Sequence, residues 1–190
     1  LYMRLYSLWV YVLHISNLRP YPNIQQAVLN AVNSSSILKR KKAMTLLSLS
    51  LNAYESHINR KFTHKFEHDT LNITALHLAV HYCDAEIIQS LMEHNASASN
   101  YDDDNYTPFH RAIQKTIQSR HSGNENDHQK MLHIVSQILQ KSPSILNQTA
   151  PDPQQTALHM ASKGGDQELA VLLIEKEANI NCVDRNGNSP

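Results

Sequence analysis

Glycine, cysteine and long apolar runs are scarce in this chain. Its four glycines are too few for the phosphate-cradling loops of P-loop and dinucleotide-binding proteins, which need glycine at several fixed positions. Its two cysteines, Cys83 and Cys182, form no C-x-x-C pair, so a disulfide framework or a structural zinc finger has no support. The most apolar stretch, residues 5–15, is shorter than the roughly 20 residues that span a bilayer, and no clear cleavage site follows it. These absences favour a reducing, cytoplasmic location.

The size and charge of the chain narrow its class further. A length of 190 residues accommodates one domain or a short repeat array. The formal net charge is zero, but residues 1–68 carry nine basic and two acidic side chains, whereas residues 69–190 carry eight and fifteen. Because a net acidic surface repels phosphates, nucleic-acid binding is not expected of the second part.

One six-residue motif occurs three times, as TALHLA at 74–79, TPFHRA at 107–112 and TALHMA at 156–161. The first two copies begin 33 residues apart, the next two 49 apart, and Ser189-Pro190 follows Thr156 by another 33. This pattern resembles the ankyrin repeat, which has a period of about 33 residues and the signature T-P-L-H-x-A. The resemblance covers residues 69–190. It implies an all-α, ankyrin-type solenoid of stacked helix-turn-helix repeats with β-hairpin or turn fingers.

The chemistry of the motif explains why it recurs. Threonine before an apolar helix acts as an N-cap, proline fits the first helical turn, and a histidine three residues after the threonine can reach back across that turn. One helix pair cannot bury its apolar face alone, so neighbouring repeats supply the core. The residues to which we assign this structural role are Thr74, His77, Thr107, His110, Thr156 and His159.

The spacing of the motif sets the expected repeat boundaries. Residues 69–101, 102–150 and 151–183 form three repeats, and residues 184–190 begin a fourth, truncated one. The middle repeat contains a polar insertion that predicts a loop over about 117–130, followed by a helix over about 130–140. Asn95, Ser142 and Glu177 stand at or near the place where family repeats usually carry glycine, which suggests marginal local stability.

The front third lacks the motif. Residues 24–33 and 41–54 predict two helices, so residues 23–68 are expected to form a helical N-terminal cap or a degenerate repeat. Residues 1–22 are an apolar segment that packs on this cap or belongs to an upstream domain. The chain starts at Leu1 and stops inside a repeat at Pro190, so we expect a fragment of a longer protein.

Twelve histidines raise the question of a metal site. His57, His64 and His68 lack a third ligand at a characteristic spacing, so no metal or other cofactor is predicted. His121, His128 and His133 lie in or beside the predicted loop and are expected to be solvated.

Catalytic signatures are also missing. The chain contains no G-x-S-x-G, H-E-x-x-H or kinase motif, so enzyme activity is not expected. The carboxylates Asp102–Asp104 fall on a predicted finger. They form either a solvated face or a contact for a basic partner. The basic run Lys39–Lys42 is either a nuclear targeting signal or a solvated helix face.

The ankyrin resemblance implies a protein-interaction module that binds a protein partner through its concave face. We expect Ile73, Tyr82 and Tyr106 to anchor the partner, because aromatic and apolar side chains dominate binding energy at interfaces. The alternative is that Tyr82 and Tyr106 only cover the apolar seam of the stack. The further exposed family positions are Thr70, Leu71, His81, Asp103, Asp104, Gln114, Lys115, Asp152, Gln155, Lys163, Gly164, Arg185 and Asn188.

Two roles fit such a module. The first is an adaptor or scaffold, including an effector that an intracellular bacterium secretes into its host cell. The second is a regulatory or targeting arm of a larger enzyme or channel whose working domain lies outside this chain. The sequence does not specify an oligomeric state, and we expect a monomer.

Overall fold

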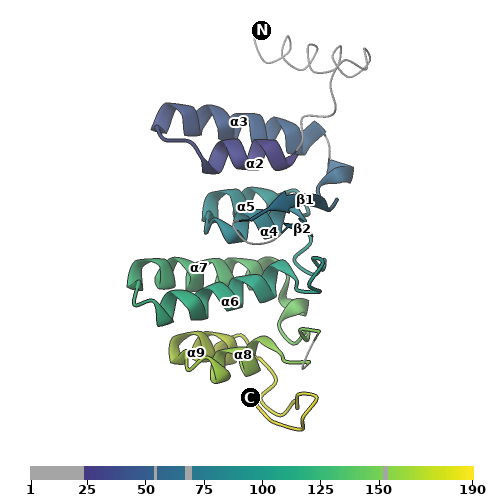
Figure 1. The fold of residues 1–190 in the computed structure, drawn as a ribbon, viewed down its shortest axis with the longest axis vertical. Helices are drawn as coiled ribbons and strands as arrows, with labels where there is room; N and C mark the ends of the chain where they lie inside the picture. The colour runs from purple at the N-terminus through teal and green to yellow at the C-terminus, as the bar shows by residue number, and fades with distance from the viewer. Residues whose placement is uncertain (1–23, 54, 67–69, 152–153) are drawn as a thin grey trace.

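The structure is a computed structural model that describes residues 24–53, 55–66, 70–151 and 154–190. The apolar segment 1–22, His68 and Asp152 therefore lie outside the described residues. The described helices form a column of stacked pairs, with their connecting fingers along one side (Figure 1). In chain order the pairs are α2 (Ile24–Val32) with α3 (Ile37–Ala53), α4 (Ala75–His81) with α5 (Ala85–Glu93), α6 (Pro108–His121) with α7 (Glu125–Lys141), and α8 (Ala157–Lys163) with α9 (Gln167–Glu175). Two short 3₁₀ helices, Glu55–His57 and Pro143–Ile145, lie between pairs.

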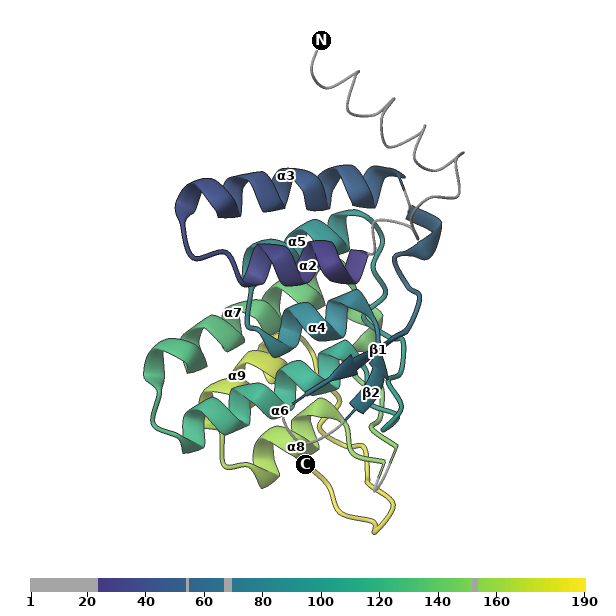
Figure 2. The same ribbon diagram turned by 45° about the horizontal axis from the view of Figure 1, so that its top comes forward.

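The helices stack in two layers. The first helices of the pairs, α2, α4, α6 and α8, contact one another in order, and so do α3, α5, α7 and α9 (Figures 1 and 2). Fully buried apolar side chains fill the seams, including Leu51 of α3, Ile88 of α5, Phe109 of α6 and Leu173 of α9. Each pair thus buries its apolar face only against its neighbours, as in other solenoids. The predicted helical solenoid is confirmed, and both helices predicted for residues 24–54 are present.

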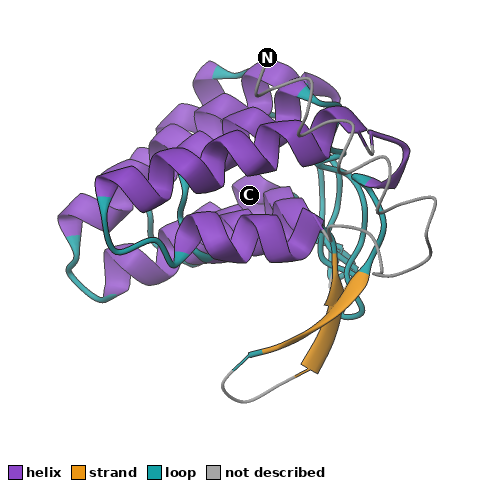
Figure 3. Cartoon of the chain, turned by 90° about the horizontal axis from the view of Figure 1, so that it is seen from above, coloured by secondary structure: helices purple, strands orange, loops and turns teal. Residues whose placement is uncertain are grey.

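In chain order, a two-stranded finger follows the first helix pair, and it projects sideways from the column (Figure 3). β1 (Phe62–Lys65) pairs antiparallel with β2 (Thr70–Ile73), so Phe62 lies opposite Ile73 and Lys65 opposite Thr70. Ile73 is only 2% exposed and belongs to the main core. The prediction that Ile73 anchors a partner is therefore wrong, because the base of the finger turns this side chain into the helix stack.

The predicted loop over residues 117–130 is also wrong. The insertion lengthens both helices of the pair, to 14 residues in α6 and 17 in α7, against 7 and 9 in α4 and α5. Only Ser122–Asn124 connect them, with Gly123 in the left-handed conformation (φ 68°) and Asn124 accepting a hydrogen bond from the Asp127 N–H. The extra turns bury side chains such as Thr116 and His128 against the stack. This tertiary packing stabilises the helical conformation of the inserted residues although their sequence is polar.

The helix ends that lack the usual glycine differ in their backbone conformation. Asn95 (φ 64°) and Glu177 (φ 68°) adopt the left-handed conformation that glycine favours. Ser142 has φ −137° and leads directly into the 3₁₀ helix at Pro143. Two of the three predicted positions therefore carry a non-glycine residue in a sparsely populated backbone region.

Candidate protein-binding groove

The recurring threonine and histidine form a cap at the start of α4, α6 and α8. The Thr74 N–H donates to His77 Nδ1 at 3.2 Å, and the Thr74 hydroxyl lies 2.8 Å from the same nitrogen. Thr156 and His159 repeat this arrangement at 3.3 and 2.8 Å. Since Nδ1 accepts a backbone N–H, the imidazole proton resides on Nε2. The predicted capping role of the motif is present at these helices.

The same histidines connect each repeat to the finger of the next. His77 Nε2 donates to the Tyr106 carbonyl at 3.1 Å, and His159 Nε2 to the Asn188 carbonyl at 3.0 Å. His110 Nε2 lies 3.1 Å from the Gln148 carbonyl. Burial lowers the pKa of His77 to about 4 and also lowers the pKa of His110. His77 and His110 are therefore neutral near pH 7, and the neutral form leaves Nδ1 of His77 free to accept the Thr74 N–H.

The second finger places its carboxylates differently from the sequence-based expectation. Asp102 is only 2% exposed and accepts the Tyr106 N–H at 2.8 Å. The Arg111 guanidinium contacts the carboxylates of Asp102 at 2.7 Å and Asp104 at 2.6 Å while lying 4.7 Å from the centre of the Tyr106 ring. The prediction of a fully solvated carboxylate face is thus wrong at Asp102, because Arg111 draws that carboxylate into the stack.

A cavity of about 660 Å³ lies between the two-stranded finger and the first helices α4 and α6. We call it the finger groove and define it by His64, Phe66, His81, Tyr82, Gln114 and Lys115. Its wall also contains Lys65, Leu71, Ile73, His77, Val80, Asp102, Asp104, Arg111 and Gln118. Five predicted partner-binding residues that are not buried, His81, Tyr82, Asp104, Gln114 and Lys115, therefore come together in this cavity.

Aromatic rings line one side of the finger groove. The Phe66 ring lies 4.7 Å from His64 and 4.6 Å from His81, and His81 lies 5.1 Å from Tyr82. Burial, with a smaller contribution from the positive charge of Lys115, lowers the pKa of His81 to about 4. The Lys115 ammonium group donates to the His81 carbonyl at 2.5 Å. The finger groove therefore combines neutral aromatic rings with a cationic group beside them.

Sequence reasoning missed the contribution of the finger to this cavity. His64 and Phe66 precede the first motif, so the repeat register did not reach them. The usable signal was the alternation of ring-bearing residues with Thr63 and Lys65 over 62–66, which is typical of a half-buried strand.

Leu71 and the buried Ile73 also belong to the wall of the finger groove, whereas the other predicted partner-binding residues lie outside it. Asp103 accepts from the Asn72 backbone and side chain at 3.2 and 2.8 Å, and Tyr106 lies beneath Arg111. Gln155 and Asn188 contact the buried Asp184 carboxylate, whereas Lys163 and Arg185 are exposed. The structure thus concentrates the predicted site on α4, α6 and the first finger.

Histidines outside the motif have diverse surroundings. The His64 ring contacts Phe66 edge to face, His121 lies 2.9 Å from the Gly164 carbonyl, and His133 is exposed. His128, predicted to be solvated, is instead fully buried, with Nε2 2.9 Å from the Asp166 carboxylate. That prediction is wrong because the helix α7 starts before His128 and turns the side chain toward α9.

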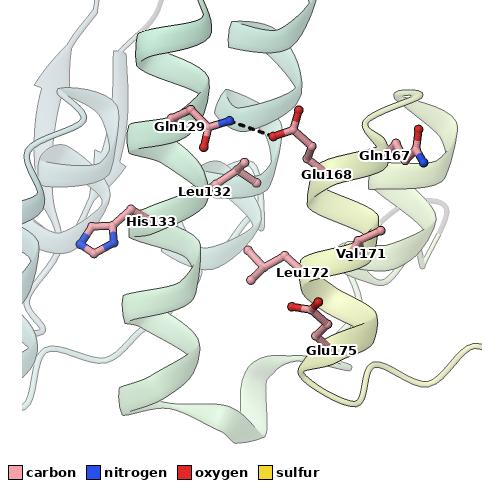
Figure 4. Close-up of a pocket in the computed structure, with 8 residues that line it drawn as sticks. All are labelled: Gln129, Leu132, His133, Gln167, Glu168, Val171, Leu172 and Glu175. Atoms are coloured by element: carbon pink, nitrogen blue, oxygen red, sulfur yellow. Dashed lines mark hydrogen bonds between the residues drawn. The ribbon is translucent and has the colours of Figure 1, made fainter.

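A second cavity, of about 500 Å³, lies between α7 and α9 (Figure 4). Leu132 of α7 and Leu172 of α9 point toward each other across it, and Gln129 donates to Glu168 at 2.8 Å at one end. Its acidic and amide rim distinguishes it from the aromatic finger groove.

The stacked helix pairs and projecting fingers define a solenoid repeat protein. Comparison with protein families matches residues 37–122 to ankyrin repeats in three copies and residues 154–185 to a further ankyrin repeat. These matches cover more than half of the chain, which therefore belongs to the ankyrin repeat proteins. No curated protein gives a significant match. Ankyrin repeats are general protein-interaction modules and are typically non-catalytic.

Within the described ranges, no helix combines the length and the apolar composition that crossing a membrane requires.

Proposed function

We propose that this chain binds a protein partner in the finger groove and acts as an adaptor or scaffold. The observation that carries the proposal is the aromatic cavity between the first finger and helices α4 and α6. Tyr82 is 38% exposed there, and tyrosine is among the residues that most often dominate interface energies. Lys115, Gln114 and Gln118 add hydrogen-bond donors beside the rings.

The composition of the finger groove suggests what the partner presents. An apolar or aromatic side chain would pack against Phe66, His81 and Tyr82, and a carbonyl or carboxylate would accept from Lys115. Arg111 already pairs with Asp102 and Asp104, and Asp103 lies 4.0 Å from the Lys61 ammonium. These pairs reduce the attraction for a basic partner that the three carboxylates alone would provide.

A matched pair of tyrosine variants tests the proposal. Tyr82→Ala removes a ring of the finger groove, whereas Tyr101→Ala removes a tyrosine of similar exposure, 40% against 38%, that does not line it. Partner proteins are captured from cell lysate with each variant and quantified by mass spectrometry. We expect Tyr82→Ala to weaken capture by about 30-fold, as for a binding hot spot.

The control variant and a folding check separate the outcomes. Tyr101→Ala should capture the same partner as the wild type, and both variants should retain the helical circular dichroism spectrum. Equal capture by wild type and a folded Tyr82→Ala variant would contradict the assignment of the finger groove as the binding site.

A further inference from the structure

Two helix N-termini converge at one cluster of titratable side chains. His128, in the first turns of α7, is fully buried, and its Nε2 lies 2.9 Å from Asp166 Oδ2. Asp166 Oδ1 accepts the Leu169 N–H at 3.1 Å and so caps α9. Both oxygens of Asp166 are thus engaged, because Oδ2 lies at hydrogen-bond distance from His128 Nε2. Nδ1 of His128 is left on the opposite edge of the ring.

Nδ1 of His128 faces carboxylates. His128 Nδ1 is buried and makes no hydrogen bond within the described residues. Glu125 Oε1 lies 3.9 Å from it, and Glu168 completes a group of three ligand atoms that all lie within 4.8 Å of one another. We call Glu125, His128 and Glu168 the Glu–His cluster. A buried nitrogen without a hydrogen-bond partner, beside carboxylate oxygens, is unfavourable unless a cation joins them.

The neighbouring groups leave the Glu–His cluster negative. Arg120 reaches Glu125 at 3.5 Å and Glu168 at 3.4 Å, which is longer than the roughly 2.7–2.9 Å of a strong charged hydrogen bond. Gln129 donates to the same two carboxylates at 2.8 Å but carries no charge. One loosely held guanidinium therefore stands against three carboxylates, including that of Asp166.

We propose that the Glu–His cluster binds a divalent transition-metal ion of the zinc type. An imidazole nitrogen and two carboxylate oxygens are a donor set that suits such ions, with a water molecule as the fourth ligand. Asp166 orients the ligating histidine through its other nitrogen, as carboxylates commonly do around zinc. Arg120, whose side chain is 43% exposed, moves to solvent when the ion binds.

The ligands can reach the ion through side-chain rotation alone. Oxygen and nitrogen ligands of tetrahedral zinc lie about 3.3 Å apart, so the cluster must contract by about an ångström or more. The Glu125 and Glu168 side chains are 61% and 45% exposed and can rotate inward when they release Gln129 and Arg120, whereas His128 is held in place by the stack. Because Glu168 belongs to α9 and the other two ligands to α7, the ion would join two repeats.

Calorimetric titration with zinc chloride tests the proposal on the full chain. We expect one ion per chain, and a melting temperature raised by about 5–10 °C at a hundredfold excess over Kd. Glu125→Gln and Glu168→Gln remove exposed ligands and should each weaken zinc binding at least tenfold. Arg120→Gln removes the competing cation and should tighten it. His133→Gln, on the exposed side of the same helix, should leave it unchanged.

Several results would overturn the proposal. Zinc binding that is absent from the wild type, or that persists at full strength in the Glu125→Gln/Glu168→Gln double variant, would do so. Magnesium or calcium binding as tightly as zinc would show that the carboxylates act without the imidazole. A proton on His128 Nδ1 that remains with saturating zinc, detected by ¹⁵N NMR, would identify the cluster as an ion-pair network instead.

Discussion

At the residue scale, the repeated histidine performs two structural tasks with two nitrogens. Nδ1 of His77 accepts from the threonine before the helix, and Nε2 donates to the Tyr106 carbonyl in the next finger. The first contact is local and sets where the helix begins. The second spans 29 residues and sets how the following finger sits on the stack. The first contact needs an unprotonated Nδ1, so protonation of the imidazole opposes it, whereas the Nε2 contact is kept.

This requirement predicts a pH dependence of stability. The folded-state pKa of His77 is about 4, below its ordinary value of 6.5, so the unfolded chain binds more protons between these pH values. Stability from this group is fully present above pH 6.5 and is lost as the pH falls to 4, with a slope of up to about 1.4 kcal/mol per pH unit. Urea denaturation at several pH values measures it.

The His77→Gln variant separates the pH dependence of stability due to His77 from that due to other titrating groups. Glutamine keeps an acceptor for the Thr74 N–H, as in an ordinary capping box, but does not titrate. We expect the variant to be less stable than the wild type at pH 7.5, with the difference shrinking as the pH falls to 4.5. His133→Gln, at an exposed position, should run parallel to the wild type. A constant difference between His77→Gln and wild type would contradict this account.

At the element scale, the long pair α6 and α7 determines how closely the following pair approaches. Gly164, at the C-terminal end of α8, has an ordinary backbone angle, φ −77°. A Cβ atom there would lie 2.6 Å from Cγ2 of Ile117 in α6. Ile117 belongs to the two extra turns of α6 that the sequence-based reading assigned to a loop. Close helix packing, rather than backbone conformation, therefore requires glycine at this position.

A double-mutant cycle tests the close approach of these helices. Gly164→Ala should destabilise the protein by about 1–3 kcal/mol through overpacking, and Ile117→Ala in the same chain should recover part of that loss. The measurement is the free energy of unfolding of the single and double variants. Gly165→Ala is the matched control, because its φ of 64° strains any side chain although nothing lies within 4 Å. Recovery of Gly165→Ala by Ile117→Ala would contradict the packing explanation.

At the scale of the whole molecule, the described helices form a stack in which each pair contacts its neighbours (Figure 2). In such a solenoid, local damage spreads to adjacent repeats more than to distant ones. The finger groove lies near the middle of the column and the Glu–His cluster farther along it. The two proposed sites can therefore be perturbed separately.

Leu51→Ala tests how far stability propagates along the stack. Leu51 of α3 is fully buried, so truncation should cost about 2–5 kcal/mol. We expect hydrogen exchange to increase in α2 to α5 while α8 and α9 remain close to wild type. Leu173→Ala in α9, equally buried, should give the opposite gradient. A uniform increase along the chain in both variants would indicate one cooperative unit instead of neighbour-coupled repeats.

The sequence by itself determined the repeat period, the caps and the helix pairs. Thr74 and His77 act within one helical turn, and apolar spacing marks the helical faces, so these features depend on residues close together in the chain. The repeat register alone also predicted Tyr82 and Lys115 on the side where the finger groove lies, because each register position has the same surroundings in every copy of an ideal array.

Only the tertiary structure decided the burial of Asp102 and His128, the place of Ile73 and the helical state of residues 117–130. Each depends on a partner that local pattern does not specify: Arg111 for Asp102, Asp166 for His128 and the helix stack for Ile73. A polar side chain looks solvated in a sequence and becomes buried when a distant group supplies its hydrogen bond. The free energy of that pairing exists only once the repeats are stacked.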